Sequence, residues 1–196
     1  AFLSKLSQAK ANWEAISQNK TRFWGSKNLK AADVTTEIHP GFMTDWQAPW
    51  TLLMTQAKGE SRVHETIYED RFGYVGQLRK MGAHIEFFHP KVKNPGKFYN
   101  FNWSDKIKNN FQAINITGPT KLHNAVLEVM DLRAGATLIL GGLLATGESV
   151  LFGVEHIDRG YEGIEERLQK LGVDIKRISA KGGSAVRLSS PSKSSG

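Results

Sequence analysis

The sequence predicts an α/β protein built from repeated βαβαββ-type units, and three observations lead to this class. The chain carries an internal repeat: four pairs of similar motifs occur in one order, and their offset drifts only from 86 residues (45 to 131) to 90 (78 to 168). Within each copy, helical spacing of apolar residues alternates with short extended stretches. A glycine follows each predicted second helix. We therefore expect two copies of one structural unit.

The first copy is predicted to run helix, strand, helix, strand. Asp45 can act as an N-cap, and the apolar residues after it recur at helical spacing until Gly59 ends the helix. β-Branched and aromatic residues then predict a strand over 62–68. A second helix is expected over 75–81, followed by a strand over 84–88.

The second copy repeats this order. Asp131 is the N-cap of a helix over 132–145, which is apolar on nearly every side and is therefore expected to be enclosed. A strand is predicted over 150–157, a second helix over 161–171, and a last strand over 174–178.

The residues before the first copy fit the end of an earlier unit. Their apolar positions have helical spacing and would form its second helix: Phe2, Leu3, Leu6 and Ala9. Residues 1–188 then make an incomplete domain that holds the end of one unit (1–35), a second unit (36–115) and a third (116–188). The serine-rich residues 189–196 are expected to be a disordered tail.

Composition narrows the class of protein. The 196 residues are 40% hydrophobic, contain no run of 18 apolar residues, and carry a formal net charge of +7, which favours anionic partners. The absence of cysteine excludes disulfides and thiolate sites and suits a cytosolic protein. No histidine pair has i,i+4 spacing, and no glycine-rich phosphate loop or nucleophile elbow occurs. We expect no metal, no cofactor and no membrane span.

Two aspartates and three arginines are the candidates for chemistry. Asp45 and Asp131 are either N-caps alone or fixed carboxylates that can take a proton from a sugar hydroxyl. Arg71 and Arg159 each follow an aspartate between a strand and a helix, where an ion pair within the fold and the binding of phosphate or carboxylate are both open. Arg133 lies in the first turn of a helix, whose N-terminus favours anions.

One segment, residues 90–110, lies outside the repeat. It interleaves five lysines, two of them Lys106 and Lys108, with Phe98, Tyr99, Phe101 and Trp103. Such a mixture can stack bases and bind single-stranded nucleic acid. We favour a surface hairpin or insertion whose aromatic rings pack on the domain.

Four motifs in the two copies resemble those of one enzyme family. Gly-Phe-Met-Thr-Asp-Trp-Gln-Ala at 41–48 is similar to Phe-Pro-Thr-Asp-x-Gln-Ala, and Glu-Thr-Ile-Tyr-Glu-Asp-Arg-Phe at 65–72 is similar to Glu-Thr-Val-Phe-Glu-Asn-Arg-Phe. Asp-Leu-Arg-Ala at 131–134 and His-Ile-Asp-Arg-Gly-Tyr-Glu at 156–162 match without change. The sequence thus resembles the UDP-N-acetylglucosamine 1-carboxyvinyltransferases. The related shikimate-pathway enolpyruvyl transferases share the fold but lack this set of motifs.

The resemblance implies a fold and a reaction. The family has two similar domains, each an inverse α/β barrel of three repeated units, with the substrates bound between them. The enolpyruvyl group of phosphoenolpyruvate passes to the 3-hydroxyl of the sugar in UDP-N-acetylglucosamine, through a tetrahedral intermediate and with release of phosphate. This is the first committed step of cytoplasmic peptidoglycan synthesis, which serves cell-wall biogenesis, cell shape and division.

The resemblance also implies roles for the candidate residues. Asp45 would contact the accepting hydroxyl and act as general base, and Arg159 would bind phosphoenolpyruvate. Ile67 would contact the UDP-sugar through its backbone, and Arg71 would line the nucleotide side. The remaining two candidates, Asp131 and Arg133, would lie near the reacting centre.

The sequence departs from the family at several points. Met43 replaces a proline, Asp70 replaces an asparagine, and 90–110 is longer than usual. The Lys-Asn pair and the loop with the Cys or Asp proton donor belong to an N-terminal half that this chain lacks, so we expect the chain alone to be inactive. The alternatives are a non-catalytic module that binds a UDP-sugar or nucleic acid, or an enzyme whose other half is a separate chain.

Overall fold

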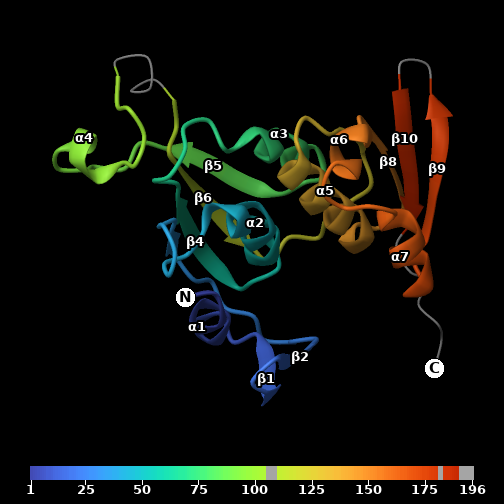
Figure 1. Cartoon of the computed structure of the whole chain (residues 1–196), viewed down its shortest axis with the longest axis horizontal. Coiled ribbons are helices and arrows are strands. Elements are labelled where there is room, and N and C mark those ends of the chain that lie inside the picture. Colours follow the sequence, from blue (N-terminus) through green and yellow to red (C-terminus); the bar gives the residue numbers. More distant parts are fainter. Residues whose placement is uncertain (105–109, 181–182, 190–196) are drawn as a thin grey trace. The chain divides into compact units, whose positions relative to one another are not determined.

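The computed structural model describes residues 1–104, 110–180 and 183–189 (Figure 1). The chain forms two compact units. Unit 1 holds Ala1–Arg71 and His84–Thr120, and unit 2 holds Phe72–Ala83 and the chain from Lys121 onward. The helix at 73–80, which lies in the sequence between the unit 1 strands at 59–64 and 84–88, therefore belongs to unit 2. The internal repeat of the sequence did not predict this division.

Unit 1 contains a four-stranded sheet in the order β3-β4-β6-β5. Its elements are β3 (Val34–Thr35), the short 3-10 helix η1 (Thr44–Trp46), α2 (Gln47–Thr55), β4 (Gly59–His64), β5 (His84–Phe88), α4 (Pro95–Phe98) and β6 (Ala113–Gly118). Strands β3 and β4 are parallel and the other neighbours are antiparallel. Helix α2 packs against β4 and β6 and encloses fully buried Trp50, Met54, Ile114 and Ile116.

Unit 2 contains a second four-stranded sheet in the order β7-β8-β10-β9. Its elements are α3 (Gly73–Lys80), β7 (Val126–Glu128), α5 (Leu132–Leu144), β8 (Glu148–Phe152), α6 (Glu155–Asp158), α7 (Ile164–Lys170), β9 (Asp174–Ala180) and β10 (Gly183–Ser189). Helix α5 packs on β8, β10, α3 and α6, while α7 packs on β9. The predicted enclosed helix is thus found, although Leu140 and Leu144 are exposed.

The two sheets have the same topology, which confirms the repeat and the βαβαββ order. In each sheet the first strand pairs in parallel with the second, and the fourth strand lies antiparallel between the second and the third. Glycines at matching positions share a positive φ that side chains rarely adopt: Gly59 (119°) with Gly147 (95°), and Gly82 (93°) with Gly172 (85°). The α/β class predicted from the sequence is therefore confirmed.

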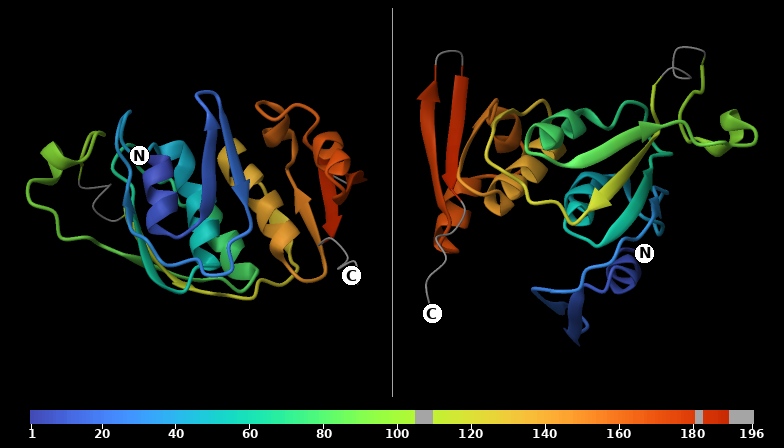
Figure 2. Two further views of the ribbon diagram at one scale, coloured as in Figure 1. Left: turned by 90° about the horizontal axis from the view of Figure 1, so that it is seen from below. Right: turned by 180° about the vertical axis from the view of Figure 1, so that it is seen from behind.

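The N-terminal helix is also found where it was predicted, as α1 (Phe2–Gln8), and belongs to unit 1. The ring of Phe2 lies 5.1 Å from that of Trp46 and 6.3 Å from that of Phe42, measured between centroids. An antiparallel hairpin of β1 (Asn12–Ser17) and β2 (Lys20–Trp24) follows α1 (Figure 2). The Phe2 contacts attach α1 to the turn that carries Asp45.

Two predicted strands were too long. Strand β4 ends at His64 rather than at 68, because the carboxylate of Glu65 accepts the backbone N–H groups of Ile67 and Tyr68 and turns the chain. Strand β8 ends at Phe152 rather than at 157, because Gly153 has φ +76° and the chain then enters α6.

Three further local predictions need correction. Helix α2 ends at Thr55, so Gly59 begins β4 instead of ending the helix. Asp45 lies inside η1 and is not the N-cap of α2, a position that Trp46 occupies. Ser189 closes β10 rather than opening a tail, and the rest of that predicted tail, 190–196, lies outside the described residues, as do Lys106 and Lys108.

The fold predicts opposite effects for two glycines that are each the fourth residue of a helix in unit 2. A Cβ at Gly135 of α5 would overlap buried Ile157 and lie 2.8 Å from a methyl of Val129, whereas one at Gly76 of α3 would meet nothing within 4 Å. We expect Gly135→Ala to lower the free energy of unfolding by roughly 1–3 kcal/mol. We expect Gly76→Ala to raise it by about 0.5–1 kcal/mol. Urea denaturation of both variants measures the difference, and equal effects would contradict the packing of α5.

Candidate functional site

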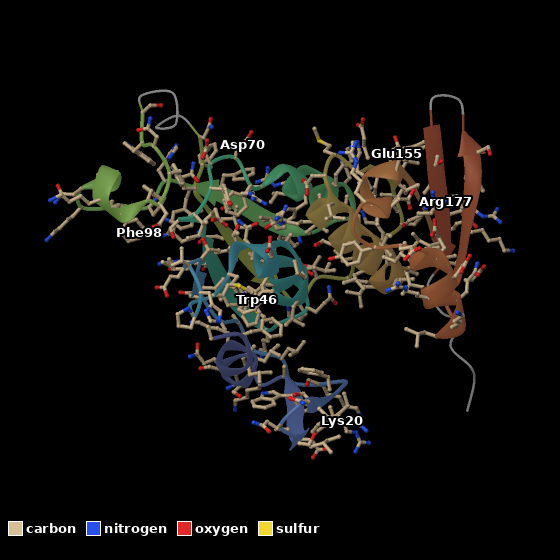
Figure 3. The ribbon with its side chains drawn as sticks, viewed as in Figure 1. Lys20, Trp46, Asp70, Phe98, Glu155 and Arg177 are labelled. Atoms are coloured by element: carbon tan, nitrogen blue, oxygen red, sulfur yellow. The ribbon has the colours of Figure 1, made fainter. Side chains whose placement is uncertain are left out.

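The turn that carries Asp45 belongs to unit 1 and leads into α2. Asp45 is exposed within η1, whereas the next residue, Trp46, packs edge-on against Phe42 at 5.4 Å between centroids (Figure 3). On its other side, Thr44 donates its hydroxyl to Glu65 Oε2 at 2.8 Å. The chain on both sides of Asp45 is therefore held by contacts with buried side chains, while Asp45 itself is exposed.

Glu65 is the central polar residue of unit 1. Its side chain is fully buried and accepts five hydrogen bonds of 2.8 to 3.2 Å. The donors are the hydroxyls of Thr36 and Thr44, the side-chain amide of Gln47, and the backbone N–H groups of Ile67 and Tyr68. A buried carboxylate is tolerated when several donors satisfy it. One side chain thereby joins the Asp45 turn to the loop that carries Ile67.

The loop after β4 presents two of the predicted site residues. Ile67 is half-buried, and the guanidinium carbon of Arg71 lies 4.2 Å from the centroid of the Tyr68 ring, a cation–π contact. Asp70 has φ +54°. Asparagine and aspartate are the side chains that most readily adopt this left-handed conformation, which explains how Asp70 can stand where the motif has asparagine.

Unit 2 places Asp131 and Arg133 at the N-terminus of α5. Asp131 Oδ1 accepts the backbone N–H of Arg133 at 2.9 Å and that of Ala134 at 3.0 Å, so the predicted N-cap is confirmed. Because α5 is 13 residues long, its first turn carries the positive end of a substantial helix dipole. Arg133 therefore lies where anions are favoured.

Arg159 is exposed directly after α6, next to an aspartate that is already paired. Asp158 receives two hydrogen bonds from Arg177 of β9, at 2.8 and 2.6 Å, and Arg177 also reaches Glu165 (Figure 3). The hydrogen bonds from Arg177 lower the pKa of Asp158, and those to Asp158 and Glu165 raise the pKa of Arg177. The ion-pair interpretation of the Asp158-Arg159 motif thus holds for Asp158, with Arg177 as its partner.

Arg159 also lies close to the start of α5. A Cβ on its neighbour Gly160 would be 2.8 Å from a methyl of Leu132, the first residue of that helix. Within unit 2 the residue after Arg159 therefore lies against the side chain of Leu132, which stands between Asp131 and Arg133 in the sequence.

Sequence reasoning assigned no role to Glu65 or Arg177. Glu65 stands inside the motif at 65–72. It continues the alternation of buried residues along β4, and a charged residue at such a position could have indicated a buried polar site. Arg177 carried no such signal, because only the pairing of β9 with its neighbours and the packing of α7 bring it to Asp158.

Unit 1 has an open pocket of about 790 Å³ beside these motifs. Thr35, Glu37, Gly41, Thr66, Phe98 and Asn100 are among its lining residues. Gly41 opens the motif that contains Asp45, and Thr66 precedes Ile67. The pocket thus adjoins both segments that Glu65 joins.

Neither a metal-binding cluster nor a membrane-spanning helix is found among residues 1–104, 110–180 and 183–189. Those residues include no cluster of three or more potential metal ligands among His, Cys, Asp and Glu. In the same part of the chain, the helices are too short or too polar to span a membrane.

Comparison with known proteins places this geometry in context. A sequence model of EPSP synthase (3-phosphoshikimate 1-carboxyvinyltransferase) matches residues 1–168. The enolpyruvyl transferase NikO from Streptomyces tendae superposes with a TM-score of 0.73 at 25% identity, over 91% of this chain and 36% of NikO. EPSP synthase from Acinetobacter baumannii has the same fold, with a TM-score of 0.61 at 16% identity over 97% of this chain and 38% of that one. The fold is therefore that of the enolpyruvyl transferases.

Among enolpyruvyl transferases, two curated relatives that this chain resembles share one name. UDP-N-acetylglucosamine 1-carboxyvinyltransferase 2 of Bacillus subtilis (strain 168) is 43% identical over 78% of this chain and 30% of its own length. The UDP-N-acetylglucosamine 1-carboxyvinyltransferase of Solibacter usitatus (strain Ellin6076) is 41% identical over 91% of this chain and 37% of its own length. The chain belongs to the EPSP synthase family of enolpyruvyl transferases, and it spans about a third of the length of these relatives.

The hydrogen bonds of Glu65 lead to a prediction about stability. Glu65→Gln replaces one acceptor oxygen with a donor that would face buried donors. We expect the free energy of unfolding to fall by about 3 kcal/mol, since unsatisfied buried polar groups cost roughly 1–3 kcal/mol each. Glu69→Gln, the same change at an exposed position of the same loop, serves as the control. Equal urea midpoints for the two variants would contradict the central role of Glu65.

The ion pairs of Arg177 lead to a second prediction. Arg177→Met should lower stability by only about 1 kcal/mol near neutral pH, because the pairs are partly exposed. The hydrogen bonds from Arg177 hold the pKa of Asp158 below its usual 3.8, so its share of this stability is present above pH 3.8 and is lost as the pH falls through the folded-state pKa. Unfolding free energies of wild type and variant should therefore converge as the pH falls through the folded-state pKa of Asp158, and a difference that stays constant throughout the acid range would refute the assignment.

Proposed function

We propose that this chain takes part in the transfer of the enolpyruvyl group from phosphoenolpyruvate to the 3-hydroxyl of UDP-N-acetylglucosamine. The observation that carries the proposal is the arrangement around Glu65. One buried carboxylate holds both the turn of Asp45 and the loop of Ile67, the two segments of unit 1 that resemble substrate-contacting motifs. Relatives named for this reaction are 41–43% identical over most of the chain.

In unit 1, Asp45 acts as the general base. It is an exposed residue on a turn whose neighbours, Thr44 and Trp46, contact buried side chains, so it can meet a sugar hydroxyl without a change of backbone. As the hydroxyl oxygen forms a bond to C2 of phosphoenolpyruvate, Asp45 accepts the hydroxyl proton. The backbone of Ile67 contacts the nucleotide sugar, and Arg71, held over Tyr68, lines the nucleotide side.

In unit 2, Arg159 binds the phosphate or carboxylate of phosphoenolpyruvate. Since Arg177 already pairs with Asp158, the carboxylate next to Arg159 in sequence does not compete for its guanidinium. Arg133 and the N-terminus of α5 add positive charge, and Asp131 keeps that turn in place. The tetrahedral adduct then loses phosphate by C–O cleavage and a proton from C3 to a base, which restores the C2–C3 double bond and forms the enol ether.

The rest of the reaction depends on groups outside the four motifs. The proton that adds to C3 of phosphoenolpyruvate comes from an acid that this chain does not supply, and we assign it to polypeptide that corresponds to the N-terminal part of the relatives. That polypeptide is the partner we propose, and the reaction would serve peptidoglycan synthesis in the cytoplasm. No cofactor is required, and nucleic acid is not a proposed partner.

The proposal predicts the effect of two substitutions in the protein expressed from its complete reading frame. Asp45→Asn should lower kcat by about 10²–10⁴-fold, because asparagine keeps the shape of aspartate but cannot accept the hydroxyl proton. Arg159→Lys should raise KM for phosphoenolpyruvate more than KM for the nucleotide sugar, because lysine cannot form a bidentate pair. Phosphate release measures both effects.

The 196-residue chain by itself should show no turnover. Calorimetric titration of that chain with UDP-N-acetylglucosamine and with an oligonucleotide at two salt concentrations tests the non-catalytic alternative. Salt-dependent oligonucleotide binding without nucleotide-sugar binding would contradict the proposal, and so would full activity of the Asp45→Asn enzyme.

A further inference from the structure

The two repeat copies differ most in the connection between their last two strands. In unit 2 only residues 181–182 separate β9 from β10, whereas in unit 1 residues 89–112 separate β5 from β6. The described part of this insertion projects from the β5–β6 hairpin of unit 1 in both views (Figures 1 and 2). We call residues 95–103 the aromatic clamp.

The aromatic clamp is attached to the end of β4 through one histidine. His64 Nε2 and the Tyr99 hydroxyl are joined by a hydrogen bond of 3.0 Å, and the His64 ring stacks on Phe98 at 5.3 Å between centroids. The ring of Tyr99, only 6% exposed, stacks in turn on Trp103 at 4.6 Å. Burial lowers the pKa of His64 to about 4 and raises that of Tyr99. Both groups are thus uncharged near neutral pH, and their hydrogen bond persists there.

The aromatic clamp also completes the hydrogen bonding of Thr66, the residue before Ile67. Thr66 donates its backbone N–H to Thr36 Oγ1 and its own hydroxyl to the Thr36 carbonyl. Its carbonyl accepts the backbone N–H of Asn100 at 2.7 Å. Thr66 is therefore held from one side by the β3 end of the sheet and from the other by the insertion.

We propose that the aromatic clamp positions the Thr66–Ile67 backbone for nucleotide-sugar binding and forms part of the wall of that binding site. This inference rests on the proposed function. Phe98 and Asn100 line the 790 Å³ pocket together with Thr66 and Glu37. An aromatic face beside amide, hydroxyl and carboxylate groups suits a ligand that offers both an apolar ring face and hydroxyl groups, as a sugar does.

The clamp acts through the loop, so its loss affects one substrate more than the other. Tyr99→Ala removes the anchor on His64 and should free the Thr66 carbonyl from Asn100. In the protein expressed from its complete reading frame, we expect KM for UDP-N-acetylglucosamine to rise roughly tenfold, as for loss of one well-placed hydrogen bond and its packing. KM for phosphoenolpyruvate and kcat should change less than twofold.

Three further variants distinguish the positioning role from a general loss of folding. Tyr99→Phe retains the ring and loses only the hydroxyl, so it should give an intermediate KM even if Tyr99→Ala folds poorly. His64→Ala removes the other partner, and its effect should not add to that of Tyr99→Ala. Lys91→Ala changes an exposed residue of the same insertion that lies outside the clamp and does not line the pocket, so it should leave every parameter unchanged.

Hydrogen exchange separates failure of this inference from failure of the proposed function. Amides of residues 65–71 should exchange faster in Tyr99→Ala than in wild type or Lys91→Ala, whereas amides of α5 should not change. If the wild type does not bind UDP-N-acetylglucosamine, the proposed function fails, and exchange still tests the clamp. Unchanged exchange at 65–71, or equal increases in KM for both substrates, would overturn the positioning role.

Discussion

The candidate site of unit 1 depends on the buried carboxylate of Glu65. The cost of removing a charge from water must be compensated by hydrogen bonds, and here five donors from three separate segments supply them. Because each donor must reach the same two oxygens, the chain at Thr36, the turn from Thr44 to Gln47 and the Ile67 loop cannot move independently. The constraint holds Asp45 in place although Asp45 itself is exposed.

The two repeat copies solve the same local problem in different ways. Both have a sheet of one topology, yet at the end of the second strand unit 1 has Glu65 and unit 2 has Gly153, followed by α6. Unit 2 instead uses Arg177 to hold Asp158, which keeps the acidic neighbour of Arg159 occupied. The connection after the second strand is therefore stabilised by different residues in the two copies, by Glu65 in unit 1 and by the pair of Arg177 and Asp158 in unit 2.

The insertion between β5 and β6 illustrates how a repeat can be adapted without disturbing its sheet. Phe88 and Ala113 remain paired in register, so the added residues leave the hairpin intact. The aromatic rings were expected to pack on the domain, and their contacts with His64 and with one another agree with this interpretation. What the composition of the segment did not reveal is the backbone contact from Asn100 to Thr66, because any residue other than proline could donate it.

The sequence by itself determined the repeat, the α/β class and most of the helices, because these follow from spacing of apolar residues along the chain. It also identified Asp131 as an N-cap, since capping is a local interaction. Only the tertiary structure decided that Asp45 lies inside a 3-10 turn, that Glu65 joins two motifs and that Arg177 pairs with Asp158. The bonds of Glu65 with Thr44 and Gln47 and of Arg177 with Asp158 link residues 18 to 21 positions apart. The distance between such residues is set by how strands pair and helices pack, which local patterns do not encode.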